Sequence, residues 1–112
     1  LMSANSLTIE DGYSPSKTIA AVQGLHPELT IRYRPALDKE RVAYRLKGQS
    51  IDPEVIDKHT TDLIISHVVS INGEEFKDRA RVSRLKPTIR SHCIDLILGY
   101  SPADEAGDIR NL

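Results

Sequence analysis

The sequence has a single cysteine, Cys93, among its 112 residues, and this scarcity excludes an internal disulfide framework. One free thiol fits a reducing compartment. Tryptophan is absent and there is only one phenylalanine, so the core must rest on isoleucine, leucine and valine. No apolar run approaches the roughly 20 residues that cross a membrane, and residues 1–10 lack the charged-then-apolar pattern of a signal peptide. We therefore expect a soluble intracellular protein that contacts no membrane.

An excess of charge of one sign is also missing. The chain has 15 basic and 16 acidic side chains, which give a net charge of −1. This balance gives no bulk attraction to nucleic acid or to an acidic membrane surface, so it disfavours nucleic acid as a partner. A length of 112 residues allows one domain with a modest core.

The first half of the chain predicts a small β-hairpin. Residues 18–22 and 29–33 have the composition of short strands joined by a loop. In the second strand, alternate residues form one apolar face, namely Leu29, Ile31 and Tyr33. A short helix over residues 15–23, capped by Ser14 and stopped by Gly24, is the rival interpretation. We favour the strand because residues 29–33 otherwise have no neighbour with which to pair.

The strongest helix start in the chain is Asp52-Pro53-Glu54, where a capping residue, a first-turn proline and an acid follow one another. This start predicts a helix from Pro53 to Val69. Its end is ambiguous, since residues 63–71 are rich in β-branched side chains and Asn72-Gly73 is typical of a hairpin turn. The strong start favours a helix, with Asn72-Gly73 as its exit.

Two further helices have similar signals. The first is expected from Asp38, as its cap, to Leu46, and the second from Pro87 to Leu98. The expected stops are Gly48 and Gly99, and the expected hydrophobic staples join Leu37 to Val42 and Ile51 to Ile56. Between residues 74 and 85 the pattern is charged and irregular, which predicts a short extended piece and one helical turn.

These elements predict a mainly α fold, with three to four helices and a small N-terminal antiparallel β-hairpin. Residues 13–100 would form this single helical domain. A flexible N-terminal arm over residues 1–12 and a flexible C-terminal tail over residues 101–112 would flank it, because both segments are polar and lack a core-facing pattern.

No catalytic or metal-binding constellation is evident. His59 and His67 lie about 12 Å apart along a helix, which is too far for one metal ion. Cys93 falls on the apolar face of the last helix, where burial raises the pKa of a thiol and hides the sulfur. The glycines stand singly, so no phosphate-binding loop is present. We predict a protein that is not an enzyme, with no cofactor and no metal site.

A basic segment runs from Lys77 to Arg90 and contains one acid, Asp78. Its basic residues are Lys77, Arg79, Arg81, Arg84, Lys86 and Arg90. Such a segment could contact phosphates, and a small nucleic-acid-binding regulator is therefore one alternative function. The segment has no interleaved aromatics for base stacking. A solvated face, or pairing with the chain's own acids, is the commoner explanation.

The last two long helices are apolar over wider arcs than a surface helix needs. Surplus apolar surface usually marks a site of partner binding or self-association, unless the two helices cover each other beneath the hairpin. The candidate partner-binding residues are Ile65, Val69, Ile71, Ile94 and Leu98, with Arg81, Arg84 and Arg90 from the basic segment.

The order of these segments resembles that of the tailed-phage tail assembly chaperones, over roughly residues 12–100. The resemblance is carried by Leu29–Ala36 leading into a charged helix, by Ile64–Ile71, by Leu85-Lys86-Pro87 and by Cys93–Tyr100. Ile71 departs from the family pattern, in which an aromatic residue, often tryptophan, is expected at this position.

This resemblance implies a small, non-enzymatic, mostly helical phage or prophage protein in the cytoplasm of a bacterial host. Such proteins bind a long tape-measure protein, keep it soluble while tail-tube subunits polymerise around it, and then leave. Binding would use exposed apolar helix faces, and a homo-oligomer is possible. A structural connector protein that stays in the finished particle is a further alternative.

Overall fold

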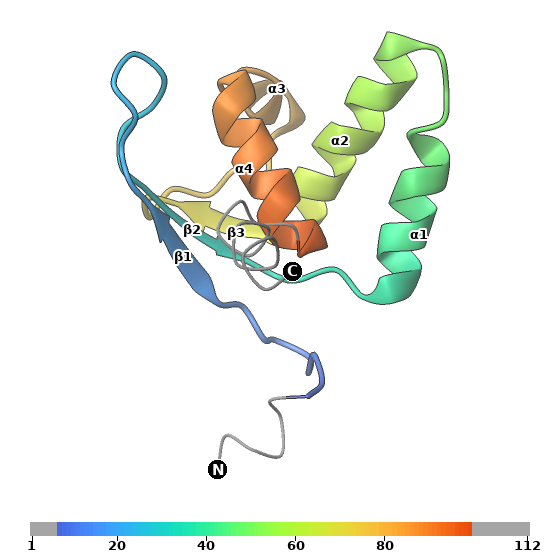
Figure 1. The fold of residues 1–112 in the computed structure, drawn as a ribbon, viewed down its shortest axis with the longest axis horizontal. Helices are drawn as coiled ribbons and strands as arrows, with labels where there is room; N and C mark the ends of the chain where they lie inside the picture. Colours follow the sequence, from blue (N-terminus) through green and yellow to red (C-terminus); the bar gives the residue numbers. More distant parts are fainter. Residues whose placement is uncertain (1–6, 100–112) are drawn as a thin grey trace, which may run out of the picture.

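The computed structural model describes residues 7–99 (Figure 1). In chain order its elements are β1 (Ser16–Ile19), β2 (Leu29–Tyr33), α1 (Asp38–Lys47), α2 (Pro53–His67), β3 (Val68–Ile71), α3 (Arg79–Ser83) and α4 (Pro87–Leu98). Helices take up 45% and strands 17% of the described residues, with the strands in one antiparallel sheet of order β1-β2-β3. The expected mainly α class is therefore wrong, and the fold is α+β.

The predicted helix over residues 53–69 ends early, and this difference creates the third strand. α2 stops at His67, and Val68 leads directly into β3, which pairs antiparallel with β2 and places Ile71 opposite Ile31. The β-branched side chains of this segment suit a strand, and β2 has a free edge that a strand can satisfy. Asn72 and Gly73, with φ of 52° and 82°, then form a tight hairpin turn rather than a helix exit.

The central strand β2 has the predicted alternation of faces. Leu29 and Ile31 are buried, while Thr30 and Arg32 are exposed on the opposite face. β1 pairs with this strand over residues 16–19, so it begins two residues and ends three residues before the predicted strand, and the rival helix over residues 15–23 is wrong. One face of the sheet is therefore apolar and covered, and the other is polar and open to solvent.

α4 packs on the apolar face of the sheet against β2, and α2 packs against α4 (Figure 1). The side chains that are almost completely buried there include Leu29, Ile31, Ile64, Val68, Val82, Cys93 and Ile97. The link from β2 to α1 is tied to the end of α4, because the Ala36 amide donates to the carbonyl of Ile97 over 2.9 Å. Within residues 7–99, no helix has the length and apolar character that a membrane crossing requires.

The predicted cap of α2 and the predicted stop of α4 are confirmed, but the predicted staple between Ile51 and Ile56 is wrong. Asp52 accepts a hydrogen bond from the Glu54 amide over 3.0 Å, and Gly99 ends α4 with φ of 83°. Ile51, however, is 97% exposed, so it makes no staple with Ile56. The hydroxyl of Ser50 accepts from the Asp52 amide at 3.1 Å, and the turn it fixes leaves Ile51 in solvent.

α1 differs from the other helices because none of its side chains is fully buried. Its cap position is Leu37 rather than Asp38, and the Leu37 amide donates to the Glu40 carboxylate over 2.9 Å. Two polar contacts join the helix to α2: the Tyr44 hydroxyl lies 3.0 Å from Thr60 Oγ1, and Glu40 Oε2 lies 3.1 Å from His67 Nε2. Polar contacts therefore make a large contribution to holding α1 in place.

The predicted flexible arm over residues 1–12 is described only from residue 7 onward, where the residues up to 12 are exposed. The predicted tail over residues 101–112 lies outside the described residues.

The side chain of Asn72 connects the β3 turn to β2, which generates a prediction. Its Oδ1 accepts from the Thr30 amide over 2.7 Å, and its Nδ2 donates to the Glu28 carbonyl over 3.1 Å. Asn72→Ala should lower the free energy of unfolding by about 2–3 kcal/mol, because it removes both bonds and places alanine at positive φ. Asn72→Asp should cost less, because it keeps the Oδ1 acceptor. Urea unfolding measures both, and wild-type stability in the Ala variant would contradict this role.

Glu40 makes the stability of the fold depend on acid. Desolvation acts to raise the pKa of Glu40, but the hydrogen bond from the Leu37 amide and the nearby charge of His67 outweigh it, so the pKa lies below its ordinary value. A carboxyl with a lowered folded-state pKa stabilises the fold above its unfolded pKa, and this contribution disappears as the pH falls through the folded pKa.

Glu40→Gln should therefore be less stable than the native chain at about pH 7, and the difference should shrink as the pH falls below the ordinary glutamate value of 4.5 and through the lowered folded-state pKa. Urea unfolding at several pH values measures this difference. A difference that stays constant across the acid range would show that the charge of Glu40 contributes nothing.

Candidate functional site

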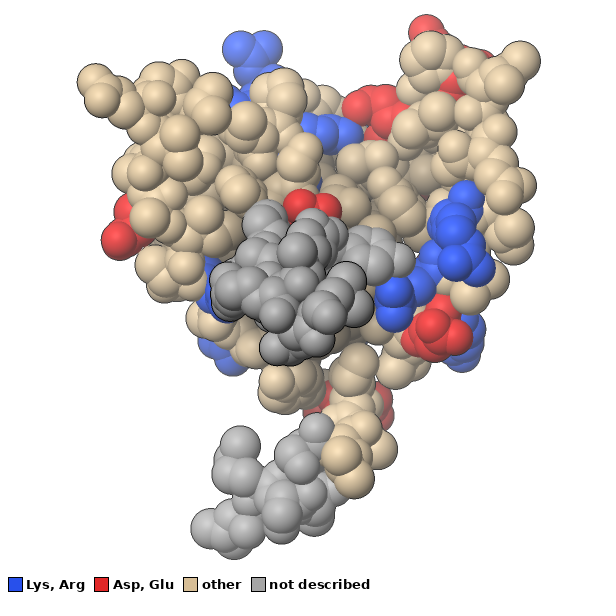
Figure 2. Space-filling view, in the orientation of Figure 1, with Lys and Arg blue, Asp and Glu red and all other residues tan. Residues whose placement is uncertain are grey.

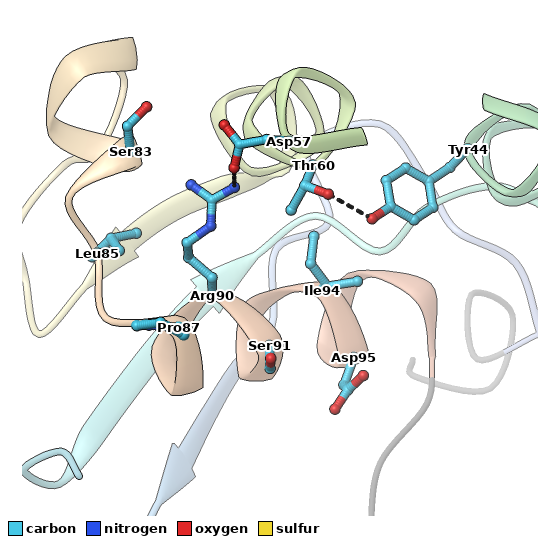
Figure 3. A pocket seen from close by; sticks show the side chains of 10 residues that line it. All are labelled: Tyr44, Asp57, Thr60, Ser83, Leu85, Pro87, Arg90, Ser91, Ile94 and Asp95. Carbon is cyan, nitrogen blue, oxygen red and sulfur yellow. Dashed lines mark hydrogen bonds and ion pairs between the residues drawn. The ribbon is translucent and has the colours of Figure 1, made fainter. Parts of the chain in front are cut away.

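An open groove of about 550 Å³ lies between α2 and α4 (Figure 3). Its lining residues come from both helices, from α1, from the end of α3 and from the connection to α4. They are Tyr44, Asp57, Thr60, Ser83, Leu85, Pro87, Arg90, Ser91, Ile94 and Asp95. We call this site the α2–α4 groove.

The groove follows from how the two helices meet the sheet. α2 runs directly into β3, so its C-terminal end is fixed beside the strands, where α4 also packs against β2. Figure 1 shows the two helices close together near the sheet and farther apart at their other ends. The segment from Ser83 to Pro87 lies along one side of the resulting opening.

The lining combines apolar and polar groups. Leu85 and Ile94 are half-buried, and the Tyr44 hydroxyl contacts that of Thr60 on the Ile94 side of the groove, away from Leu85 (Figure 3). Carboxylates, hydroxyls and a guanidinium make up the polar part of the lining. Figure 3 shows the Asp57–Arg90 pair between Leu85 on one side and Tyr44 and Ile94 on the other, so apolar groups flank a polar centre. Such a mixed lining suits an amphipathic segment of another chain.

Arg90 is a structural clamp in this groove rather than a free cation. Its side chain is 13% exposed, and Nη2 donates to Asp57 Oδ1 over 2.9 Å and to Thr61 Oγ1 over 3.2 Å. Nη1 donates to the carbonyl of Val82 over 3.2 Å. One guanidinium therefore joins α4 to α2 and to α3. Its donors are directed at this chain, so the candidate partner role of Arg90 finds no support in its contacts.

Most of the basic segment makes contacts within the chain. Lys77 donates to the carbonyls of Ile65 and Val68, where the change from helix to strand leaves acceptors unsatisfied. Arg79 pairs with Asp62, and this hydrogen bond is the main reason why the pKa of Asp62 is lowered.

Arg81 also contacts its own chain. Its Nη2 lies 3.1 Å from Glu74 Oε2, and its guanidinium carbon lies 4.5 Å from the centre of the Phe76 ring. Arg84 and Lys86 are exposed. Arg79, Arg81 and Arg90 pair with the chain's own acids, which was one of the open explanations, although Arg79 and Arg81 stay about half exposed. Figure 2 shows the basic side chains of one face in separate groups among acidic ones rather than in one continuous patch.

The apolar candidate residues do not lie on one surface. Ile71 and Leu98 are 4% and 7% exposed, because Ile71 faces Ile31 across the sheet and Leu98 points into the core, so neither offers a surface to a partner. Ile65 and Val69 are half-buried. Ile94 is the one candidate from this group that lines the groove.

Sequence patterns did not identify the other apolar positions that remain accessible. The described residues with large exposed apolar side chains include Leu46, Ile51 and Ile56 around the α1–α2 connection, and Val22 and Leu25 in the β1–β2 loop. The staple pattern placed Ile51 against Ile56, and so its exposure could not be anticipated. Tyr44 carried no distinguishing local signal, since its position depends on contact between α1 and α2.

The two groups that were weighed for chemistry are held inside the fold. Cys93 is fully buried, and burial raises the pKa of its thiol to about 12, which makes it a poor nucleophile. His67 is buried as well, with Nδ1 near the Leu63 carbonyl and Nε2 near Glu40. Across residues 7–99, no three His, Cys, Asp or Glu side chains are grouped in a way that could hold a metal ion.

The clamp role of Arg90 can be tested against an exposed arginine in the same segment. Arg90→Gln should lower the free energy of unfolding by about 2–3 kcal/mol, because it leaves the Val82 carbonyl and Thr61 without their partner. Arg84→Gln should change it by less than about 0.5 kcal/mol. Chemical unfolding measures both variants, and equal effects at the two positions would rule out the clamp.

No family model matches this chain, and neither a curated protein nor a solved structure matches it. Its function must therefore be argued from the groove, the exposed apolar residues and the resemblance of its segments.

Proposed function

We propose that this chain is a tail assembly chaperone of a tailed phage, a non-enzymatic protein that binds a long helical tape-measure protein and keeps it soluble. The α2–α4 groove is the observation that carries the proposal. The resemblance over residues 12–100 supports it, because the resembling segments coincide with β2, with the α2–β3 junction and with α4. These elements form the sheet and the wall of the groove.

The chemistry of the groove supports an amphipathic helix as its occupant. Such a helix presents apolar side chains on one face, which fit against Leu85, Ile94 and the ring of Tyr44. Its polar groups would meet the Asp57–Arg90 pair, in which Asp57 is largely exposed. Exposed charged groups influence orientation and association rate more than affinity.

The exposed apolar side chains around the α1–α2 connection support a longer contact. Leu46 and Ile51 are 57% and 97% exposed, and Ile56 follows on the first turns of α2. Together with the groove they leave apolar surface that the described part of the chain does not cover. A tape-measure protein is long and helical, so it can occupy an extended surface of this kind.

The proposal gives the basic segment mainly a structural role. A nucleic-acid-binding regulator would need free cations, and Lys77, Arg79, Arg81 and Arg90 all contact the chain itself. A structural connector protein is distinguished by its fate, because a connector remains in finished phage particles and a chaperone does not. Mass spectrometry of purified particles therefore separates these two roles.

A co-expression experiment tests the proposed groove. The chain would be produced together with the product of a long reading frame directly downstream of its gene, the place expected for a tape-measure protein, and the soluble long protein and the complex would be measured. Ile94→Asp should weaken the complex by about tenfold or more, because it replaces an apolar group of the groove lining with a charge.

Leu25→Asp is the matched control, since it adds the same charge at an exposed apolar residue in the β1–β2 loop. It should leave the complex intact, and circular dichroism would establish that both variants fold. Loss of binding in Leu25→Asp but not in Ile94→Asp would reject the groove. An absence of any complex with the native chain would reject the chaperone function.

A further inference from the structure

Two histidines that are 66 residues apart in the sequence meet between the β1–β2 loop and α4. Their Nε2 atoms are 3.3 Å apart, and the rings are almost perpendicular, with centroids separated by 5.0 Å. His26 is buried and His92, on α4, is half-buried. Neither residue belongs to the α2–α4 groove, so the pair is unrelated to the site described above.

The hydrogen bonding of His26 determines which of its nitrogens carries a lone pair. Its Nδ1 lies 2.7 Å from the carbonyl oxygen of Pro27, and because a carbonyl can only accept, Nδ1 must carry the proton. In a neutral ring the lone pair is then on Nε2, which faces His92. A bond from the second ring nitrogen to a backbone carbonyl is also what orients histidines that bind metals.

The distance between the two Nε2 atoms fits a shared metal ion. Two nitrogen ligands at about 2.0–2.1 Å from a tetrahedral Zn²⁺ stand roughly 3.3–3.4 Å apart. When no metal is bound, His92 Nε2 can donate directly to His26 Nε2 at this distance. Imidazole nitrogens are among the commonest ligands of Zn²⁺ and neighbouring transition metals.

We propose that His26 and His92 form a two-imidazole site for a divalent transition metal ion, with Zn²⁺ as the representative. No third metal-binding side chain joins them within residues 7–99, so water would complete the coordination. The bound ion would connect the β1–β2 loop to α4 through two metal–nitrogen bonds. Because an ion that binds only the folded chain stabilises it, Zn²⁺ should raise the melting temperature.

The experiment uses the full chain without a histidine tag, at a pH where imidazole is neutral. Zn²⁺ is titrated by calorimetry, and the melting temperature is measured with and without the ion. His92→Gln is the test variant, because a Gln amide can still donate to His26 Nε2 but does not replace an imidazole ligand. His59→Gln, at a half-buried position on α2, is the matched control.

We expect the native chain and His59→Gln to bind one Zn²⁺ and to gain thermal stability. His92→Gln should melt near the ion-free native chain and bind Zn²⁺ about tenfold or more weakly. Should His92→Gln fail to fold, His92→Ala, which suits a helix, replaces it. Three results would overturn the proposal. They are no binding of Zn²⁺ by the native chain, binding by both His92 variants that is as tight as that of the native chain, and a loss of binding in His59→Gln to the same extent as in His92→Gln.

Discussion

The antiparallel pairing of β2 with β3 is the constraint on which the rest of the structure depends. β2 is bonded on both edges, and its apolar face holds Leu29 and Ile31, which are among the most deeply buried side chains. Because β3 begins at Val68, α2 must end at His67, and its last turn is fixed next to the sheet. The direction of α2, and therefore the groove that it forms with α4, follows from this single pairing.

Local chemistry was sufficient to predict where α2 and α4 begin and where α4 ends. The capping carboxylate of Asp52, the prolines at the first turns of α2 and α4, and the left-handed Gly99 all act within a few residues of the boundary that they set. The alternation along residues 29–33 was equally readable, because a period of two needs only the strand itself. These features required no knowledge of the tertiary fold.

The boundary between helix and strand after His67 could not be decided in the same way. Residues 63–71 fit both a buried helix and a strand, and the deciding factor was the free edge of β2, about 40 residues earlier in the chain. The Asn72-Gly73 signal was correct for a hairpin turn, but the strong helix start at Asp52 outweighed it. The local sequence allowed either a helix or a strand after His67, and pairing with the distant strand β2 decided for the strand.

The candidate site was still harder to predict, because its residues come from several helices and meet only in the folded chain. Arg90 looked like one of several surface cations, yet its neighbours Asp57 and Val82 come from other elements. The meeting of His26 with His92 joins two segments that no spacing rule connects. Residue type and periodicity can indicate that apolar surface is left over, but only the arrangement of helices shows where it lies.

The attachment of α1 has a consequence for how the molecule opens. Since this helix buries no side chain completely, polar bonds to α2 carry a larger share of its attachment than they do for the helices that bury core residues. Segments of this kind are the first to exchange amide hydrogens with solvent, while the sheet and α4 stay closed. Helix α1, which contributes Tyr44 to the α2–α4 groove, can therefore unfold locally while the core stays folded.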